Sequence, residues 1–381
     1  MSRLATVPMR SLLDDKRKSK QATNGDSIWC LNLDQIESHS GKVLNKLVVK
    51  AADVGPSTYA FERGTVLYSK LRPYLNKVVV ADEDGMATTE LVPLRCDETR
   101  VMPIYLGHFL RSPDFLAFAT NVVAGAKMPR MVMGEFWSYP VPIPPLEEQR
   151  RIAAILDQAE TLRTQRRQAL AHLDTLTQSL FLDVLNSAGS DVKKLTVDNG
   201  MDAIIDYRGK TPEKTAQGVP LVTAKVVKNG ELLEPDEFIA EDAYDDWMRR
   251  GFPEAGDVLF TTEAPLGEVA QLDGRKIALA QRLLVLRGKS GVLQNTFLRF
   301  ALTSWEVRRQ IETRATGSTV KGIRQKELRQ VELPIPPYAL QQTFATRIQA
   351  IESLKATHRA ALTQLDALFA SLQQRAFAGE L

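Results

Sequence analysis

The sequence predicts a mixed α/β (α+β) fold in which two similar globular domains are joined by two long antiparallel coiled-coil helices and related by a pseudo-two-fold axis. Three observations predict this class: an internal repeat, short apolar runs separated by turn residues, and two long segments with helical periodicity. The length of 381 residues is sufficient for roughly two to four domains of ordinary size.

The repeat has a period of 192 residues. Residues 141–145 (VPIPP) recur as 333–337 (LPIPP), and Gln149 falls on Gln341. The same ungapped offset also aligns 64–68 with 256–260, Pro73 with Pro265, and Gly125 with Gly317. A tandem duplication explains these matches, because the period is far too long for a solenoid, whose repeats span about 20–50 residues.

Each copy begins with a globular part, residues 1–140 and 188–332. Short runs rich in Val, Leu and aromatic residues alternate there with Gly, Pro, Asp and Asn, which is typical of strands joined by turns. Residues 104–118 and 295–313 are predicted to be helical. Each globular part is therefore expected to be a mixed α/β domain.

Each copy ends with a long helical segment, residues 141–187 and 333–381. The paired prolines favour a helix start, and apolar residues then recur in steps of three and four, as in a coiled-coil seam. A helix of roughly 40 residues is about 60 Å long and must bury its apolar stripe. Because the second helix starts from the domain at which the first helix ends, the two copies are expected to pack antiparallel.

One position of this seam is polar in both copies, where Arg166 and His358 stand. A polar residue within a seam often fixes the register of the two helices. The alternative is that both side chains belong to a solvated edge, and the sequence leaves both interpretations open.

Composition excludes several classes of protein. With 49 basic and 46 acidic residues, the net charge of +3 neither requires nor excludes nucleic-acid binding. No apolar run approaches the roughly 18 residues of a membrane helix, and the N-terminus lacks the apolar core of a secretory signal. Cys30 and Cys96 are too few for a disulfide framework. We therefore expect a cytoplasmic protein without a membrane partner.

The sequence contains none of the common motifs for catalysis or cofactor binding. There is no G-x-G-x-x-G after a strand, no phosphate-binding P-loop, no H-E-x-x-H and no G-x-S-x-G. The four histidines are scattered along the chain. We therefore expect a non-catalytic chain with no metal site and no cofactor of its own.

Loops in both globular parts carry residue types that contact DNA. Lys and Arg neutralise phosphates, Ser and Thr fix position, and Arg or Asn can read guanine or adenine. The loops at 70–77 and 124–130 recur at the 192-residue offset with different side chains, which suggests two readers on one scaffold, although each stretch alone could be a solvated loop. The candidate DNA-binding residues are Lys70, Arg72, Tyr74, Asn76, Lys77, Lys127 and Arg130 in the first part, and Arg208, Lys210, Thr211, Thr261, Thr262, Ser318, Thr319, Lys321 and Arg324 in the second.

With these features, the sequence resembles the specificity (S) subunits of type I restriction–modification systems. The resemblance lies in residues 142–152 (PIPPLEEQRRI) and in 334–337 (PIPP) with Gln341. Residues 61–77 and 206–212 (DYRGKTP) are similar to segments of target-recognition domains. The resemblance covers essentially the whole chain.

This resemblance implies a division of labour. Residues 1–140 and 188–332 would be target-recognition domains, each reading one half of a bipartite, asymmetric site in double-stranded DNA. Residues 141–187 and 333–381 would be spacer helices that set the spacer length and dock two methylation subunits. Those subunits would bind S-adenosylmethionine and methylate adenine, and up to two restriction subunits, which use ATP and Mg, would join them. The chain itself would be the non-catalytic DNA-recognition subunit of this methyltransferase and endonuclease complex.

Other functions stay open at this point. The chain could be a helical scaffold protein that does not bind DNA, a specificity subunit adopted by another phage-defence system, or an enzyme with an unrecognised site.

Overall fold

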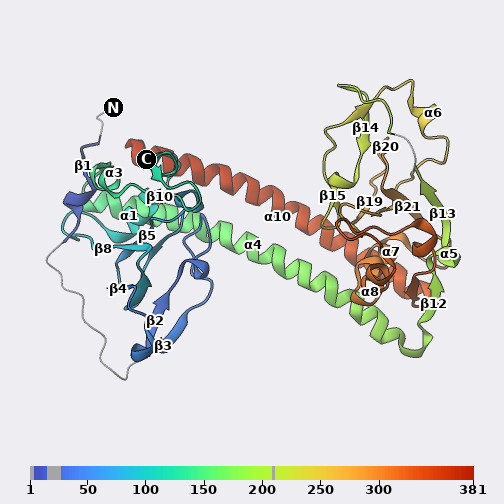
Figure 1. The fold of residues 1–381 in the computed structure, drawn as a ribbon, viewed down its shortest axis with the longest axis horizontal. Helices are drawn as coiled ribbons and strands as arrows, with labels where there is room; N and C mark the ends of the chain where they lie inside the picture. The colour runs from blue at the N-terminus through green and yellow to red at the C-terminus, as the bar shows by residue number, and fades with distance from the viewer. Residues whose placement is uncertain (1–3, 15–26, 208–210) are drawn as a thin grey trace. The chain divides into compact units, whose positions relative to one another are not determined.

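The computed structural model describes residues 4–14, 27–207 and 211–381 (Figure 1). The chain forms two compact units, Met1–Gln168 with His358–Leu381, and Ala169–Thr357. Both boundaries between these units fall within long helices, α4 (Leu146–Ala188, 43 residues) and α10 (Tyr338–Ala378, 41 residues). Each unit therefore consists of one globular part and one portion of each helix.

The first unit contains a four-stranded and a three-stranded sheet (Figure 1). The four-stranded sheet has the order β3 (Leu47–Lys50), β2 (Ser27–Leu31), β7 (Gly85–Thr88), β4 (Thr58–Phe61). The three-stranded sheet has the order β6 (Val78–Val80), β5 (Val66–Ser69), β8 (Leu91–Leu94). The unit also contains α1 (Pro103–Leu110), α2 (Pro113–Asn121), the hairpin β9 (Val123–Ala124) and β10 (Arg130–Met131), α3 (Met133–Ser138), and the pair β1 (Thr6–Pro8) and β11 (Pro140–Pro142).

The second unit also has a four-stranded and a three-stranded sheet. Their orders are β13 (Met201–Asp206), β21 (Leu283–Gly288), β18 (Val258–Thr261), β19 (Val269–Gln271), and β17 (Phe238–Ile239), β14 (Val219–Val222), β20 (Ala278–Leu279). It also contains β12 (Lys193–Thr196) paired with β22 (Glu332–Ile335), the hairpin β15 (Val227–Lys228) and β16 (Glu231–Leu232), α5 (Val197–Gly200), α6 (Tyr244–Trp247), α7 (Asn295–Thr303), α8 (Trp305–Arg314) and α9 (Gln325–Leu328).

The sequence repeat is a structural repeat. In the first unit Val66 of β5 lies opposite Leu94 of β8, and in the second unit Val258 of β18 lies opposite Leu286 of β21. Both members of the second pair are 192 residues beyond those of the first. The β5–β8 and β18–β21 pairs therefore share one register, and the duplication predicted from the sequence is confirmed. The next strand is shifted by one residue, since Val66 lies opposite Val80 whereas Val258 lies opposite Gln271.

The helices after each sheet differ from the prediction. The sequence predicts one helix over 104–118 and one over 295–313, but each is divided, into α1 and α2 and into α7 and α8. Ser112 caps α2, because its side chain accepts a hydrogen bond from the backbone N–H of Phe115, and Pro113 fits the first turn of that helix. Ser304, at the equivalent position, is likewise extended and begins α8.

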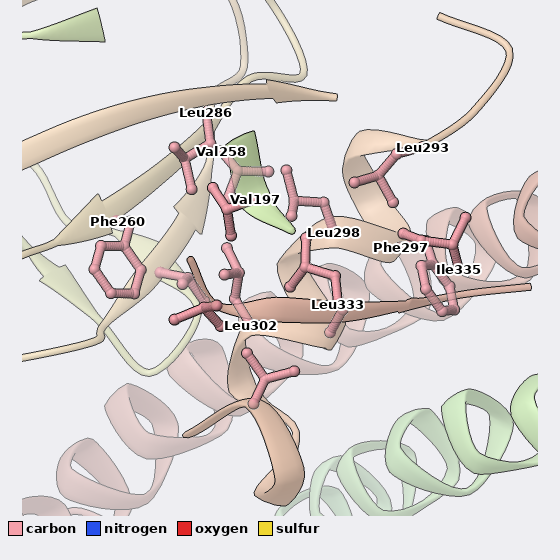
Figure 2. Packing of buried hydrophobic residues seen from close by; sticks show 14 of the residues in the cluster. Val197, Val258, Phe260, Leu286, Leu293, Phe297, Leu298, Leu302, Leu333 and Ile335 are labelled. Carbon is pink, nitrogen blue, oxygen red and sulfur yellow. The ribbon is translucent and has the colours of Figure 1, made fainter. Parts of the chain in front are cut away.

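Apolar side chains from the sheet, α7 and both long helices form a large buried cluster in the second unit. Figure 2 shows the part of this cluster that comes from the sheet, α7 and β22. Val258 and Phe260 of β18 and Phe297 of α7 are fully buried. Phe297 is also 5.2 Å from the ring of Phe181 in α4 and 5.8 Å from that of Phe344 in α10. Because burial of one such side chain stabilises a fold by about 1.5–3 kcal/mol, these rings anchor both helices to the globular part.

A glutamine fixes the start of each long helix. The Gln149 side chain accepts a hydrogen bond from the N–H of Met102 at 2.9 Å and donates to the carbonyls of Arg100 and Pro144, each at 2.9 Å. Gln341 makes the three equivalent bonds, to Gln294, Val292 and Pro336, at 2.8–2.9 Å. Both glutamines are fully buried. The repeated glutamine after each proline pair is therefore a structural bracket between helix and domain.

Within each unit, α4 and α10 pack antiparallel. In the first unit Arg163 Nε lies 2.6 Å from Asp366 Oδ1. In the second unit Lys355 Nζ lies 2.8 Å from Asp174 Oδ1. Lys355 and Asp366 are 192 residues beyond Arg163 and Asp174, so the two ion pairs are equivalents. The polar seam residues also meet, since Arg166 Nη1 lies 3.0 Å from His358 Nδ1, which favours a role in the seam over a solvated edge.

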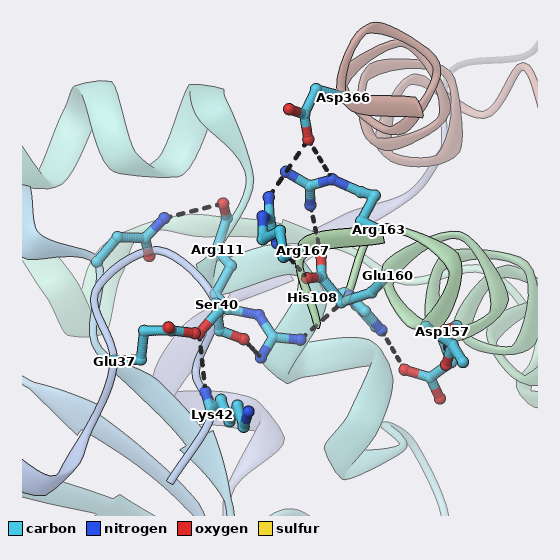
Figure 3. A network of polar contacts seen from close by, with 12 residues as sticks. Glu37, Ser40, Lys42, His108, Arg111, Asp157, Glu160, Arg163, Arg167 and Asp366 are labelled. Carbon is cyan, nitrogen blue, oxygen red and sulfur yellow. Dashed lines mark hydrogen bonds and ion pairs between the residues drawn. The ribbon is translucent and has the colours of Figure 1, made fainter. Parts of the chain in front are cut away.

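A buried histidine links α1 to α4 in the first unit (Figure 3). His108, which is fully buried, lies with Nε2 2.7 Å from Asp157 Oδ1, and its Nδ1 is 3.2 Å from Nη2 of Arg111. Arg111 in turn donates to the carbonyl of Ser40 at 3.1 Å. A neutral imidazole with its proton on Nε2 satisfies both partners. Burial is the main cause that lowers the pKa of His108, although Asp157 opposes it.

Acidification is expected to destabilise this unit through His108. Because the pKa of His108 is lower in the folded chain than its ordinary value, the unfolded chain takes up the proton first as the pH falls. The free energy of unfolding is therefore expected to decrease as the pH falls below about 6.5, the ordinary pKa of histidine. Thermal unfolding at pH 7.5 and 5.5 should show a smaller loss for His108→Gln than for the wild type, whereas equal losses would exclude His108 as the cause.

Candidate nucleic-acid interface

In the first unit, three segments meet beside the end of β5. Residues 69–72 form the end of β5 and the turn after it, Glu90 precedes β8, and residues 123–131 form the β9–β10 hairpin. The N–H of Lys70 donates to the carbonyl of Glu90 at 3.0 Å, and the N–H of Met131 donates to the carbonyl of Lys70 at 2.8 Å. We call residues 69–72, 90 and 123–131 the first loop cluster.

The second unit has the same arrangement beside β18. The N–H of Thr262 donates to the carbonyl of Arg282 at 2.9 Å, and the N–H of Ile323 donates to the carbonyl of Thr262 at 2.9 Å. These bonds are those of the first unit shifted by 192 residues. Residues 261–264, 282 and 315–323 therefore form an equivalent second loop cluster.

Both clusters use the same unusual backbone conformations. Gly125 and Gly317 have φ values of 92° and 109°, and a Cβ at Gly317 would lie 2.1 Å from the carbonyl oxygen of Val320, so this turn requires glycine. Arg72 and Ala264 each have a φ of 49° before a proline. Left-handed geometry at such residues costs about 1–2 kcal/mol and is concentrated at functional sites.

Most of the first set of predicted DNA-binding residues lies on the surface of the first loop cluster or next to it. Arg72, Tyr74, Lys127 and Arg130 are exposed, and Lys70 is half-buried. The fold therefore places three cations and an aromatic ring on exposed loops around the end of β5, where they can contact a phosphate backbone.

Asn76 and Lys77 require a correction. Asn76 is only 6% exposed, and its Nδ2 donates to the carbonyl of Arg111 at 3.1 Å. Lys77 is half-buried, and its Nζ donates to the carbonyl of Leu33 at 2.6 Å. Both side chains hold the loop onto the domain, so we remove them from the candidate DNA-binding set.

The second set of predicted residues is divided in a similar way. Thr211, Ser318, Thr319, Lys321 and Arg324 are exposed, and Thr262 is half-buried. Arg208 and Lys210 lie outside the described residues.

Thr261 is fully buried and also requires a correction. Its hydroxyl donates to the carbonyl of Pro265 at 2.6 Å and accepts from the N–H of Glu268 at 2.8 Å. These bonds close the turn after β18, so Thr261 is a structural residue and we remove it from the candidate set.

Glu90, Glu263 and Arg282, which are not among the predicted DNA-binding residues, complete both clusters. Arg130 Nη2 lies 2.8 Å from Glu90 Oε1, and this hydrogen bond lowers the pKa of Glu90. In the second cluster Arg282 Nε lies 2.5 Å from Glu263 Oε1. Glu90 and Arg282 are equivalent positions just before a strand. Neither residue lies in a predicted loop, so only the fold shows that they belong to the two clusters.

The second cluster also surrounds a cavity of about 520 Å³. Its polar lining includes Thr262, Glu263, Gln281, Arg282, Thr316 and Arg324. Within the described parts of the chain, no group of His, Cys, Asp and Glu side chains is arranged to hold a metal ion. No described helix is long and apolar enough to cross a membrane. The lining of this cavity is therefore polar and partly basic.

The two-unit fold with its paired helices belongs to a known class. The family described as the type I restriction modification DNA specificity domain matches residues 56–172 and 206–366, and the chain belongs to this family. It is 32% identical over 149 residues to the type I restriction enzyme EcoDI specificity subunit of Escherichia coli, a match that covers 38% of this chain and 33% of that protein. The putative MjaX specificity subunit of Methanocaldococcus jannaschii is 22% identical over 348 residues, which cover 80% of this chain and 75% of that protein.

Solved structures show the same fold. The S subunit of a type I restriction–modification system from M. genitalium superposes with a TM-score of 0.62 at 13% identity, over 98% of this chain and 96% of that one. A chain from a type I R-M system studied for complex assembly and conformational transition has a TM-score of 0.58 at 19% identity, over 100% and 99% of the two chains.

Proposed function

We propose that this chain is the DNA sequence-specificity subunit of a type I restriction–modification complex. Each globular domain reads one half of a bipartite, asymmetric site in double-stranded DNA, and the paired helices set the spacer. The observation that supports this function most strongly is the pair of loop clusters, which have one backbone frame but different side chains. Two loop clusters with the same backbone hydrogen bonds but different side chains are suited to bind two half-sites of different sequence.

The chemistry of modification belongs to other subunits in this proposal. Methylation subunits bind S-adenosylmethionine and methylate adenine, and restriction subunits, where present, use ATP and Mg. The present chain supplies positioning through exposed Lys, Arg, Ser and Thr side chains, and specificity through groups that reach the base edges.

The paired helices offer matched docking surfaces for two methylation subunits. In the first unit Leu162 and Leu368 are 43% and 50% exposed, and in the second unit Leu354 and Leu176 are each 46% exposed. Leu354 and Leu368 are 192 residues beyond Leu162 and Leu176. The same pair of exposed leucines thus occurs in each unit, as expected if one kind of partner binds twice.

Binding by the complex tests this function. The chain, purified with its methylation subunits, is expected to form a sequence-selective complex with duplex DNA at physiological salt, with an affinity that falls as salt rises because Lys and Arg displace counterions. Replacing Lys127 and Lys321 by alanine should reduce the salt dependence. A complex whose DNA affinity is independent of salt and sequence would contradict the proposal and favour a scaffold role.

A further inference from the structure

Each loop cluster contains an arginine paired with a glutamate. In the first cluster Arg130 contacts Glu90 through two nitrogens, with Nη2 2.8 Å and Nε 3.1 Å from Oε1. In the second cluster Arg282 Nε lies 2.5 Å from Glu263 Oε1. The arginine is the more exposed partner in both pairs, with side chains 44% and 56% exposed against 23% and 37% for the glutamates.

The two pairs are not copies of each other. Under the 192-residue offset, Arg130 corresponds to Gly322, Glu90 to Arg282, and Leu71 to Glu263. An arginine that forms an ion pair with a glutamate therefore occurs in both clusters, although the two pairs occupy positions that are not equivalent under the repeat. Common descent of the two halves does not account for this recurrence, whereas a shared chemical task does.

The geometry of the guanidinium indicates that task. It carries five N–H donors in one plane and has no acceptor. In Arg130 the glutamate occupies the edge formed by Nε and Nη2, so the Nη1 and Nη2 end still presents two parallel donors. Guanine offers two acceptors, O6 and N7, at matching spacing in the major groove, whereas adenine and cytosine each present an amino group that would oppose a donor.

We infer that Arg130 and Arg282 each read a guanine, one in each half of the DNA site, and that Glu90 and Glu263 are positioning residues that hold the guanidinium plane. This inference rests on the proposed function. The second cluster has space for the contact, since Glu263 and Arg282 line its cavity of about 520 Å³. If the two Arg–Glu pairs only held surface loops together, replacing their residues would not change which bases the complex recognises.

The test uses the complete complex with its methylation subunits and duplexes that carry its methylated motif. Each guanine is replaced in turn by 7-deazaguanine, which lacks the N7 acceptor. We expect one such replacement in each half-site to weaken wild-type binding about tenfold, as loss of one of two hydrogen bonds would. In Arg130→Gln the replacement in one half should have no further effect, and in Arg282→Gln the replacement in the other half should have none.

A matched control is Arg329→Gln, which removes an exposed ion pair with Asp198 outside both loop clusters. It should keep the wild-type response to every 7-deazaguanine. Glu90→Gln and Glu263→Gln should retain binding but reduce the preference for guanine over adenine at the same base, a readout that a purely structural pair would not change. Arg130→Lys serves if the glutamine variant does not fold, because it keeps the charge and loses the planar pair of donors.

The outcomes separate this inference from the function on which it rests. If the wild-type complex has no sequence-selective site, the proposed function fails. If it has a bipartite site but one half lacks guanine, or if 7-deazaguanine weakens wild type and variant equally, the inference alone is wrong.

Discussion

Insertion of seven residues into each long helix, after Gln168 in α4 and after Thr357 in α10, should lengthen the DNA spacer by about three base pairs. Seven residues add about 10 Å of helix at about 1.5 Å per residue, and B-DNA advances about 3.4 Å per base pair. Seven residues also preserve the heptad repeat, so the apolar seam continues across the insertion. The two insertion points lie close to the Arg166–His358 contact, where the antiparallel helices are opposite each other.

Mapping of methylated adenine across the genome of a host that carries the variant measures the new spacer directly. Insertion into α4 alone is the control, because it puts the two helices out of register and should abolish methylation. A double-insertion variant that still methylates the wild-type motif with its original spacer would show that the helices do not act as a ruler.

Gln149→Leu is expected to lower the free energy of unfolding by about 3 kcal/mol or more. The glutamine satisfies one N–H and two carbonyls, and each buried polar group left without a partner costs about 1–3 kcal/mol. Gln341→Leu should have a similar effect, because its three bonds are equivalent.

Urea unfolding of the full chain, followed by far-ultraviolet circular dichroism, measures this change. Gln342→Leu is the matched control, since Gln342 is exposed and directly follows Gln341. Surface substitutions of this kind usually change stability by about 0.5 kcal/mol or less. Equal effects at Gln341 and Gln342 would show that the buried amide does not anchor the helix.

Much of the fold could be predicted because the two halves of the sequence repeat can be compared with each other. An ungapped offset over so many positions predicts that both halves share one strand register, and the pairing of Val66 with Leu94 and of Val258 with Leu286 confirms it. Other strands depart from this offset: Val66 also lies opposite Val80, whereas Val258 lies opposite Gln271, an offset of 191 (271 − 80) for the partner strand. The first strand of each half departs as well. Pro8 lies opposite Pro140, whereas Thr196 lies opposite Glu332, an offset of 188 for the first strand (196 − 8) against 192 for its partner (332 − 140).

The candidate site was less predictable because burial depends on tertiary contacts. Asn76 and Thr261 belong to stretches of DNA-binding composition, yet both are buried. Asn76 bonds to the carbonyl of the distant Arg111, and the Thr261 hydroxyl closes the turn at the end of β18. Conversely, Glu90 and Arg282 are adjacent to strands and only the fold brings them beside the loops. Residue types in the sequence predicted which loops face DNA. The ion pairs Arg130–Glu90 and Arg282–Glu263 could be identified only from the structure.

The most direct test of two separate readers is to map methylated adenine for the wild type and for a variant in which Arg72, Lys127 and Arg130 are all alanine. We expect the wild type to mark one bipartite motif with two unlike halves. In the variant, one half should tolerate other bases while the other half and the spacer are unchanged. A motif without a spacer, or a variant in which both halves are relaxed to the same extent, would contradict this account.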